Sequence, residues 1–210
     1  TDEFDDLYLK YEADKTIPKK TVPAQDLFFD LLKERAETGR IYIMNLDHCN
    51  THSSFKDKVS MSNLCQEITL PTTPIQDIHD EQGEIALCIL SAVNVGGLND
   101  LSELENICDL SVRALEQIID YQDYPVKAAE VSTKKRRSLG IGYIGLAHYL
   151  AKNGVKYSDP KAWELVDRLT EAFQYQLLRA SCNIAMEKGK CEGFERTKYA
   201  DGQLPIDHCK

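Results

Sequence analysis

Apolar residues recur every three or four positions in three parts of the chain, which is the spacing of an amphipathic helix. The first helix is expected to begin near Pro23 and to stop near Gly39. The second is expected to begin at a capping box formed by Ser102 and Glu105, and the third to be capped by Asp159. The three apolar stripes comprise Leu27, Phe28, Leu31 and Leu32; Leu104, Ile107, Cys108, Leu115, Ile118 and Ile119; and Trp163, Val166, Leu169, Phe173, Leu177, Ala180 and Ile184. The second stripe predicts that Cys108 is a core residue.

Other runs of the sequence predict strands and shorter helices. Residues 41–44 and the fully apolar residues 85–90 are expected to form strands, and residues 65–70 a short strand or extended arm. The polar residues 45–54 are expected to be a loop at the carboxyl end of the first strand. A short helix before residue 17 and an apolar helical segment from 138 to 149 complete the pattern. This alternation, with no repeat or low-complexity linker, indicates one α/β unit.

The composition narrows the class of protein. Thirty-four acidic against 25 basic residues give a net charge of −9, which disfavours a nucleic-acid-binding face or an anionic membrane surface. No stretch approaches the length of apolar sequence that a membrane span needs, and the first residues do not resemble a signal peptide. A cytoplasmic protein with no nucleic-acid or membrane partner is therefore expected. Because the chain lacks an initiating Met, Thr1 is expected not to be a natural start.

Three local patterns offer chemistry that the surrounding sequence disfavours. The seven cysteines are odd in number and contain no Cys-x-x-Cys pair, which argues against a disulfide scaffold and a zinc ribbon. His48, Cys49 and His52 lack further ligands at suitable spacing, so a structural loop is favoured and no metal site is expected. The glycines at 140, 142 and 145 fit a dinucleotide-binding pattern, but the basic residues 134–137 precede them where a strand is required. That basic run is expected to be a solvated face.

Asn63, Cys65 and Glu67 are two residues apart, and backbone conformation decides whether they can cooperate. In a helix two residues advance about 200°, so the thiol would point away from the other two groups. In an extended arm all three share one face within roughly 14 Å, while Leu64 and Ile68 point to the other face and can anchor the arm. An amide, a thiol and a carboxylate could then face a ribose: the thiol as a sulfur radical that takes hydrogen from a sugar carbon, the carboxylate as a proton acceptor. The spacing alone leaves open a buried Cys and a solvated Glu.

The longer string that contains these residues resembles a known family. Residues 62–68 read Ser-Asn-Leu-Cys-Gln-Glu-Ile and are followed by Leu-Pro-Thr at 70–72, which resembles the active-site finger loop of class I ribonucleotide reductase large subunits. Residues 39–43, 47–52, 83–88, 121–125 and 139–142 resemble the same family in the same order. The resemblance implies that residues 1–210 are a partial catalytic domain, truncated at both ends, from the ten-stranded α/β barrel of these subunits.

The resemblance also implies a role for each matched residue. Cys65 matches the transient thiyl radical that removes the 3′ hydrogen, and Glu67 matches the general base at the 3′ hydroxyl. Asn63 matches the residue hydrogen-bonded to the ribose hydroxyls. Cys88 matches one member of the cysteine pair that reduces the 2′ position and becomes a disulfide, with its partner expected upstream of Thr1.

The implied activity is reduction of ribonucleoside diphosphates to deoxyribonucleoside diphosphates. The backbone from Asn63 to Glu67, including Leu64 and Gln66, is expected to line the substrate site. No cofactor is expected to bind this chain directly: the radical would come from a separate metal-containing small subunit and the electrons from an external dithiol of the thioredoxin or glutaredoxin type. The remaining segments of the large subunit are the other expected partners, and the isolated chain is expected to be inactive.

Two rival interpretations stay open from the sequence. A cobalamin-dependent or anaerobic reductase also uses a cysteine radical, although the string at residues 83–88 is more typical of class I enzymes. A non-catalytic assembly module would keep the barrel pieces and lose the chemistry. The joint presence of Cys65, Glu67 and Cys88 argues against that second rival.

Overall fold

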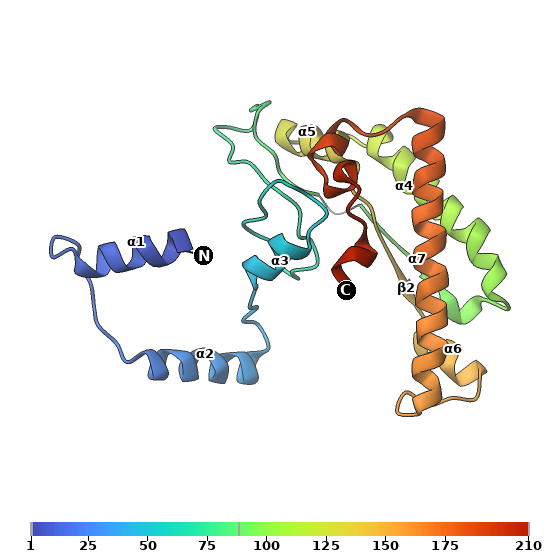
Figure 1. Ribbon diagram of the computed structural model, residues 1–210, viewed down its shortest axis with the longest axis horizontal. Coiled ribbons are helices and arrows are strands. Elements are labelled where there is room, and N and C mark those ends of the chain that lie inside the picture. The colour runs from blue at the N-terminus through green and yellow to red at the C-terminus, as the bar shows by residue number, and fades with distance from the viewer. Residues whose placement is uncertain (1, 88, 210) are drawn as a thin grey trace. The chain divides into compact units, whose positions relative to one another are not determined.

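The computed structural model describes residues 2–87 and 89–209 (Figure 1). Internal contacts divide the chain into two compact units. Unit 1 comprises Thr1–Ser53 and Val59–Thr69, and unit 2 comprises Ser54–Lys58 and Leu70–Lys210.

Unit 1 is built from three helices, α1 (Asp2–Ala13), α2 (Ala24–Thr38) and α3 (Leu46–His52). Pro23 occupies the N-cap of α2, and Gly39 ends the helix in the left-handed conformation at φ 66°, where its N–H donates to the Arg35 carbonyl. The predicted helix from Pro23 to Gly39 is therefore confirmed. None of the residues of α2 is buried, so its apolar stripe lies on an exposed surface of the described chain.

The predicted strand at residues 41–44 and the loop at 45–54 are both wrong. Residues 41–44 form no strand, because a strand needs a partner for its N–H and C=O groups and the described residues supply none here. The polar stretch contains helix α3. Asn50 anchors this helix: its Nδ2 donates to the Leu46 and Val59 carbonyls, and its Oδ1 accepts a hydrogen bond from the Val59 N–H at 2.8 Å.

Unit 2 is organised around two parallel strands, β1 (Leu90–Asn94) and β2 (Gly140–Ile144), paired from Leu90 opposite Gly140 to Asn94 opposite Ile144. Between the strands run α4 (Leu104–Tyr121) and α5 (Lys127–Arg136), and α6 (Leu146–Lys152) and the long α7 (Pro160–Lys188) follow β2. Figure 1 shows α4 and α7 lying side by side, and these two helices pack together. Short 3-10 turns occupy Val95–Gly97, Leu101–Glu103, Glu192–Arg196, Lys198–Asp201 and Pro205–Cys209. Parallel strands joined through helices confirm the α/β class.

Two of the predicted elements of unit 2 are displaced. The strand expected at 85–90 begins at Leu90, and residues 140–144 form β2 where a helix was expected from 138 to 149. Close approach explains the strand at Gly140: its N–H donates to the Ile89 carbonyl at 2.9 Å, and a Cβ there would meet Leu90 Cδ2 at 2.4 Å. Backbone pairing thus outweighs the helical spacing of the apolar residues around it.

The core of unit 2 lies between β1, α4, α6 and α7, and its fully buried members include Val95, Leu104, Cys108 and Leu169. Cys108 is 0% exposed, which confirms its predicted core position, and burial raises the pKa of its thiol to about 11. Two predicted stripe members, Ile118 and Trp163, are instead exposed.

The predicted cap of α7 is observed, and the predicted cap of α4 is not. Asp159 caps α7 as expected, because its carboxylate accepts from the Lys161 N–H at 3.0 Å. At the start of α4, the acceptor is Asp100 and not Ser102: the Asp100 carboxylate accepts from the Ser102 N–H, while Glu103 reaches back to the Asn99 N–H. The side-chain cap therefore lies two residues earlier than predicted, and it caps the 3-10 turn Leu101–Glu103 that precedes α4.

Candidate functional site

The segment that contains Asn63, Cys65 and Glu67 is a closed loop and not an extended arm. The Gln66 N–H donates to the Asn63 carbonyl at 3.2 Å, and Gln66 adopts a left-handed conformation at φ 62°. Further along, the Ile68 N–H donates to Asn63 Oδ1 at 3.0 Å, and the Ser62 hydroxyl donates to the Ile68 carbonyl at 2.7 Å. These bonds join both ends of the loop, so the sequence-based prediction of an extended arm is wrong here.

The turn changes how the loop presents its side chains. With a turn at residues 64–66, strict alternation of faces does not hold, and Leu64 is 81% exposed instead of anchored in a core. Cys65 and Glu67 are exposed, whereas Asn63 and Gln66 are half-buried. The loop therefore presents a thiol and a carboxylate at its surface and uses the amide oxygen of Asn63 for its own hydrogen bonds.

The hydrogen bonds of Asn63 fix which way its amide points. The atom that faces the Ile68 N–H must be the oxygen, because two donors cannot bond to each other. Nδ2 forms no hydrogen bond within the described part of the chain, and its two hydrogens can be donated to a ligand. The residue predicted to bind ribose hydroxyls is thus also the residue that closes the loop.

Cys88 lies outside the described residues, but its neighbours on both sides are held in unit 2. On the N-terminal side, Glu84 forms an antiparallel bridge with Thr73, with backbone hydrogen bonds of 3.0 and 3.1 Å. On the C-terminal side, Ile89 is buried among Leu115 and Ile119.

A buried charge network surrounds the Glu84 side chain. Glu84 and Arg136 form an ion pair in which the side chains are 5% and 4% exposed, and Lys135 donates to the other carboxylate oxygen. Burial works against ionisation of Glu84, but the hydrogen bonds from Lys135 and Arg136 outweigh it and lower its pKa. Arg136 also donates to Asp57 at 3.1 Å. Glu84 is therefore a charged carboxylate held by two cations.

Asp57 is the second carboxylate of this network. Arg196 Nε donates to both of its oxygens, at 2.8 and 2.9 Å. Chiefly because of these hydrogen bonds, and with a further contribution from Arg136, the pKa of Asp57 falls to about 2. Asp57 is consequently ionised at any physiological pH.

The prediction that residues 134–137 form a solvated face is wrong for Arg136, and sequence reasoning missed the network. Arg137 also pairs, with Glu116 and Asp120. A signal was present: Ala128, Ser132 and Arg136 are four residues apart, and all three are buried on one face of α5. A search for large apolar residues overlooks such a face because its members are small or charged.

Two local patterns of the sequence concern a metal ion and a dinucleotide. Within residues 2–87 and 89–209 no three His, Cys, Asp or Glu side chains are grouped so that they could hold a metal ion. The glycines at 140 and 142 lie inside β2, and Gly145 precedes only the seven-residue helix α6. None of the described helices has the length and apolar character that crossing a membrane requires.

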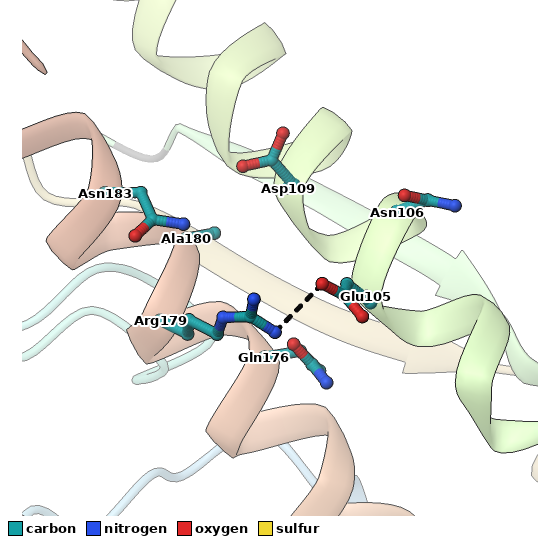
Figure 2. Close-up of a pocket in the computed structure, with 7 residues that line it drawn as sticks. All are labelled: Glu105, Asn106, Asp109, Gln176, Arg179, Ala180 and Asn183. Carbon is teal, nitrogen blue, oxygen red and sulfur yellow. Dashed lines mark ion pairs between the residues drawn. The ribbon is translucent and has the colours of Figure 1, made fainter.

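A polar groove with a volume of about 200 Å³ lies between α4 and α7 (Figure 2). Glu105 and Arg179 form an ion pair of 2.9 Å across it, with both side chains about half exposed. The remaining lining residues are Asn106, Asp109, Gln176, Ala180 and Asn183. The groove contains none of the predicted site residues.

Comparison with known proteins identifies one family. A sequence model of the ribonucleotide reductase barrel domain matches residues 1–210. The chain is 59% identical to the alpha subunit of ribonucleoside-diphosphate reductase from Haemophilus influenzae, a match that covers 100% of the chain and 28% of that protein. It is 54% identical to subunit alpha of ribonucleoside-diphosphate reductase 1 from Escherichia coli K12, over 100% of the chain and 28% of the relative. For the alpha subunit of phage T4 the identity is 40%, over 98% of the chain and 27% of the relative. The chain thus spans little more than a quarter of the length of these curated relatives.

Proposed function

The chain belongs to the ribonucleotide reductase barrel-domain family, and on that premise we propose that it supplies the active-site loop of a class I catalytic subunit. Its fold is part of the α/β barrel of that family. In this proposal, residues 1–210 contribute one portion of a single catalytic barrel that reduces ribonucleoside diphosphates to 2′-deoxyribonucleoside diphosphates. The proposal is supported by the closed loop at residues 62–68, which presents an exposed thiol and carboxylate from one short segment.

The proposed chemistry assigns one step to each group. Cys65, as a thiyl radical, takes the 3′ hydrogen atom of the ribose, and Glu67 accepts the proton of the 3′ hydroxyl. The 2′ hydroxyl leaves as water with one hydrogen of the thiol pair as its proton, and C2′ receives the other hydrogen. Cys88 and its partner cysteine are thereby oxidised to a disulfide, which supplies the two electrons. Cys65 then returns the hydrogen atom to C3′. Asn63 donates a hydrogen bond to a ribose oxygen through Nδ2.

Other components complete the proposed enzyme. A separate metal-containing small subunit would generate the radical, and a dithiol protein of the thioredoxin or glutaredoxin type would reduce the disulfide. The remaining segments of the catalytic subunit would supply the second cysteine of the pair. Such dithiol chemistry suits the reducing cytoplasm.

The test is single-residue replacement in the complete catalytic subunit, assayed with the radical-generating subunit, a dithiol reductant and a ribonucleoside diphosphate. Cys65→Ser is expected to abolish deoxynucleotide formation, since a hydroxyl does not form the radical. Glu67→Gln is expected to lower the rate by about 10²- to 10⁴-fold, the usual contribution of a general base. Cys182→Ser, which changes an exposed cysteine outside the loop, is the matched control and should retain activity.

Three results would contradict the proposal. Deoxynucleotide formation that survives Cys65→Ser would exclude the thiyl role. An active enzyme that needs no separate radical-generating subunit would favour the cobalamin-dependent or anaerobic rival. A wild-type subunit that binds the substrate and stays inactive with all components present would favour the non-catalytic module.

A further inference from the structure

We propose that Arg136 and Glu84 act as an internal anchor for the segment that leads to Cys88, so that Arg136 is a positioning residue for the reduction step. This inference rests on the proposed function, because it assigns a purpose to the buried charges next to the reducing cysteine. All the contacts that support it lie within unit 2.

The segment is fixed at its N-terminal end through backbone and side chain together. Glu84 exchanges two backbone hydrogen bonds with Thr73, and the Ile85 N–H donates to the Ala128 carbonyl of α5 at 3.2 Å. Gly83 lies so close to Ile75 that an added Cβ would approach its Cγ2 to 2.4 Å. The Glu84 carboxylate then binds Lys135 and Arg136 at the end of α5.

The segment is also fixed at its C-terminal end. Ile89 is 6% exposed, and its carbonyl accepts from the Gly140 N–H of β2. Only residues 86–88 separate this anchor from Ile85. A change that loosens Glu84 would therefore act directly on the short stretch that contains Cys88.

Arg136 has the shape that this anchor requires. One terminal nitrogen of the guanidinium binds Glu84, the other binds Asp57, and the guanidinium lies 5.6 Å from the centre of the Phe55 ring. A lysine carries one nitrogen on a flexible stem and cannot hold two carboxylates in this planar arrangement. Buried ion pairs add little to stability, because the cost of desolvating both charges offsets their attraction. A stabilising role therefore does not account for an arginine held between two carboxylates, whereas a positioning role does.

The experiment compares Arg136→Lys with Arg113→Lys in the complete subunit. Arg113 is a matched control because it also binds two carboxylates, those of Asp109 and Glu187, but at the surface between α4 and α7. The pre-reduced subunit is mixed with the radical-generating subunit and a ribonucleoside diphosphate in the absence of external reductant. Deoxynucleotide yield and the fraction of Cys88 in a disulfide are then measured, together with kcat and KM in the presence of reductant.

The inference predicts a loss in the reduction step with binding preserved. Arg136→Lys should lower kcat and the rate of disulfide formation at Cys88 by on the order of ten- to a hundredfold, as small displacements of reacting groups do, with KM unchanged. Arg113→Lys should match the wild type. Glu84→Gln, which keeps the shape and the acceptor oxygen, serves as the deciding variant if Arg136→Lys does not fold, and should show a smaller loss in kcat alone.

The outcomes separate the inference from the function on which it rests. Disulfide formation at Cys88 at the wild-type rate in Arg136→Lys, or in Glu84→Gln if Arg136→Lys does not fold, would overturn the anchor. The proposed function would remain intact. An equal loss of substrate binding and kcat would also overturn it, because a structural defect affects both. An inactive wild-type subunit would instead contradict the proposed function itself.

Discussion

Among single residues, Asp57 makes the stability that the charge network gives to unit 2 depend on pH. Its pKa of about 2 lies below the ordinary value of 3.8, mainly because Arg196 donates hydrogen bonds to the carboxylate. A group whose pKa is lowered by folding stabilises the folded state above its ordinary pKa. The contribution of Asp57 is therefore complete above about pH 4 and is lost as the pH falls toward 2.

Asp57→Asn should remove this acid-sensitive contribution. The variant is expected to be less stable than the wild type by about 2 kcal/mol at pH 7, with the difference shrinking between pH 4 and pH 2. Urea unfolding at a series of pH values measures this difference. Asp5→Asn, at an exposed position of α1, is the control. A difference between wild type and Asp57→Asn that stays constant over the whole range would contradict the assignment.

The prediction for Cys108 was confirmed because the helical spacing of the apolar residues carried the information. Asn63, Cys65 and Glu67 were singled out by a contiguous string, and their roles stay predictions. The pairing of Arg136 with Glu84 joins residues 52 positions apart, and nothing local specifies it. The sequence therefore predicted a solvated surface for charged residues that pair with carboxylates far away in the chain.

At the scale of elements, Asp100 caps the 3-10 turn Leu101–Glu103 that leads into α4. Its side chain accepts a hydrogen bond from the Ser102 N–H at 2.8 Å, and the Glu103 carboxylate accepts one from the Asn99 N–H. Asp100→Ala should lower the free energy of unfolding, and Ser102→Ala should lower it by clearly less. Urea unfolding of both variants tests the order. A larger effect at Ser102 would restore the cap position predicted from the sequence.

The errors in the predicted elements have a common physical origin. The helices with a cap and a long apolar stripe, α2, α4 and α7, were all predicted near their observed bounds. Strands depend on partners far away in the sequence, and β1 and β2 are paired across about 50 residues. Residues 41–44 had the composition of a strand but no partner strand among the described residues, whereas residues 140–144 had glycines and a partner. Composition alone could not separate these cases.

At the scale of the whole molecule, the two units bury their apolar residues to different extents. In unit 2, Leu104, Cys108 and Leu169 are fully buried within the described chain. On α1 and α2 of unit 1 the large apolar side chains are exposed, among them Phe4, Tyr8, Leu27, Phe28 and Phe29. The chain also spans only 28% of its relatives from Haemophilus influenzae and Escherichia coli.

Hydrogen exchange should therefore distinguish the isolated chain from the same residues in the complete subunit. Amides of α4 and α7 are expected to be protected in both, because their shared core is contained in the chain. Amides of α2 should exchange rapidly in the isolated chain and become protected in the complete subunit, where further segments can cover its apolar stripe. Equal exchange of α2 in the two samples would show that the helix needs no such cover.

The closed loop of unit 1 has a consequence for the polarity of ligand recognition. Because Asn63 Oδ1 accepts from the Ile68 N–H and lies 3.2 Å from the Ser62 hydroxyl, the side chain offers a ligand chiefly the two hydrogens of Nδ2. Asn63→Asp would preserve the acceptor that closes the loop and replace the outward donor by a second acceptor. Substrate affinity measured for Asn63→Asp should fall while the loop stays intact, whereas Asn63→Ala should lose both. The bond that shapes the backbone therefore also determines which hydrogen-bonding groups of a ligand this side chain can bind.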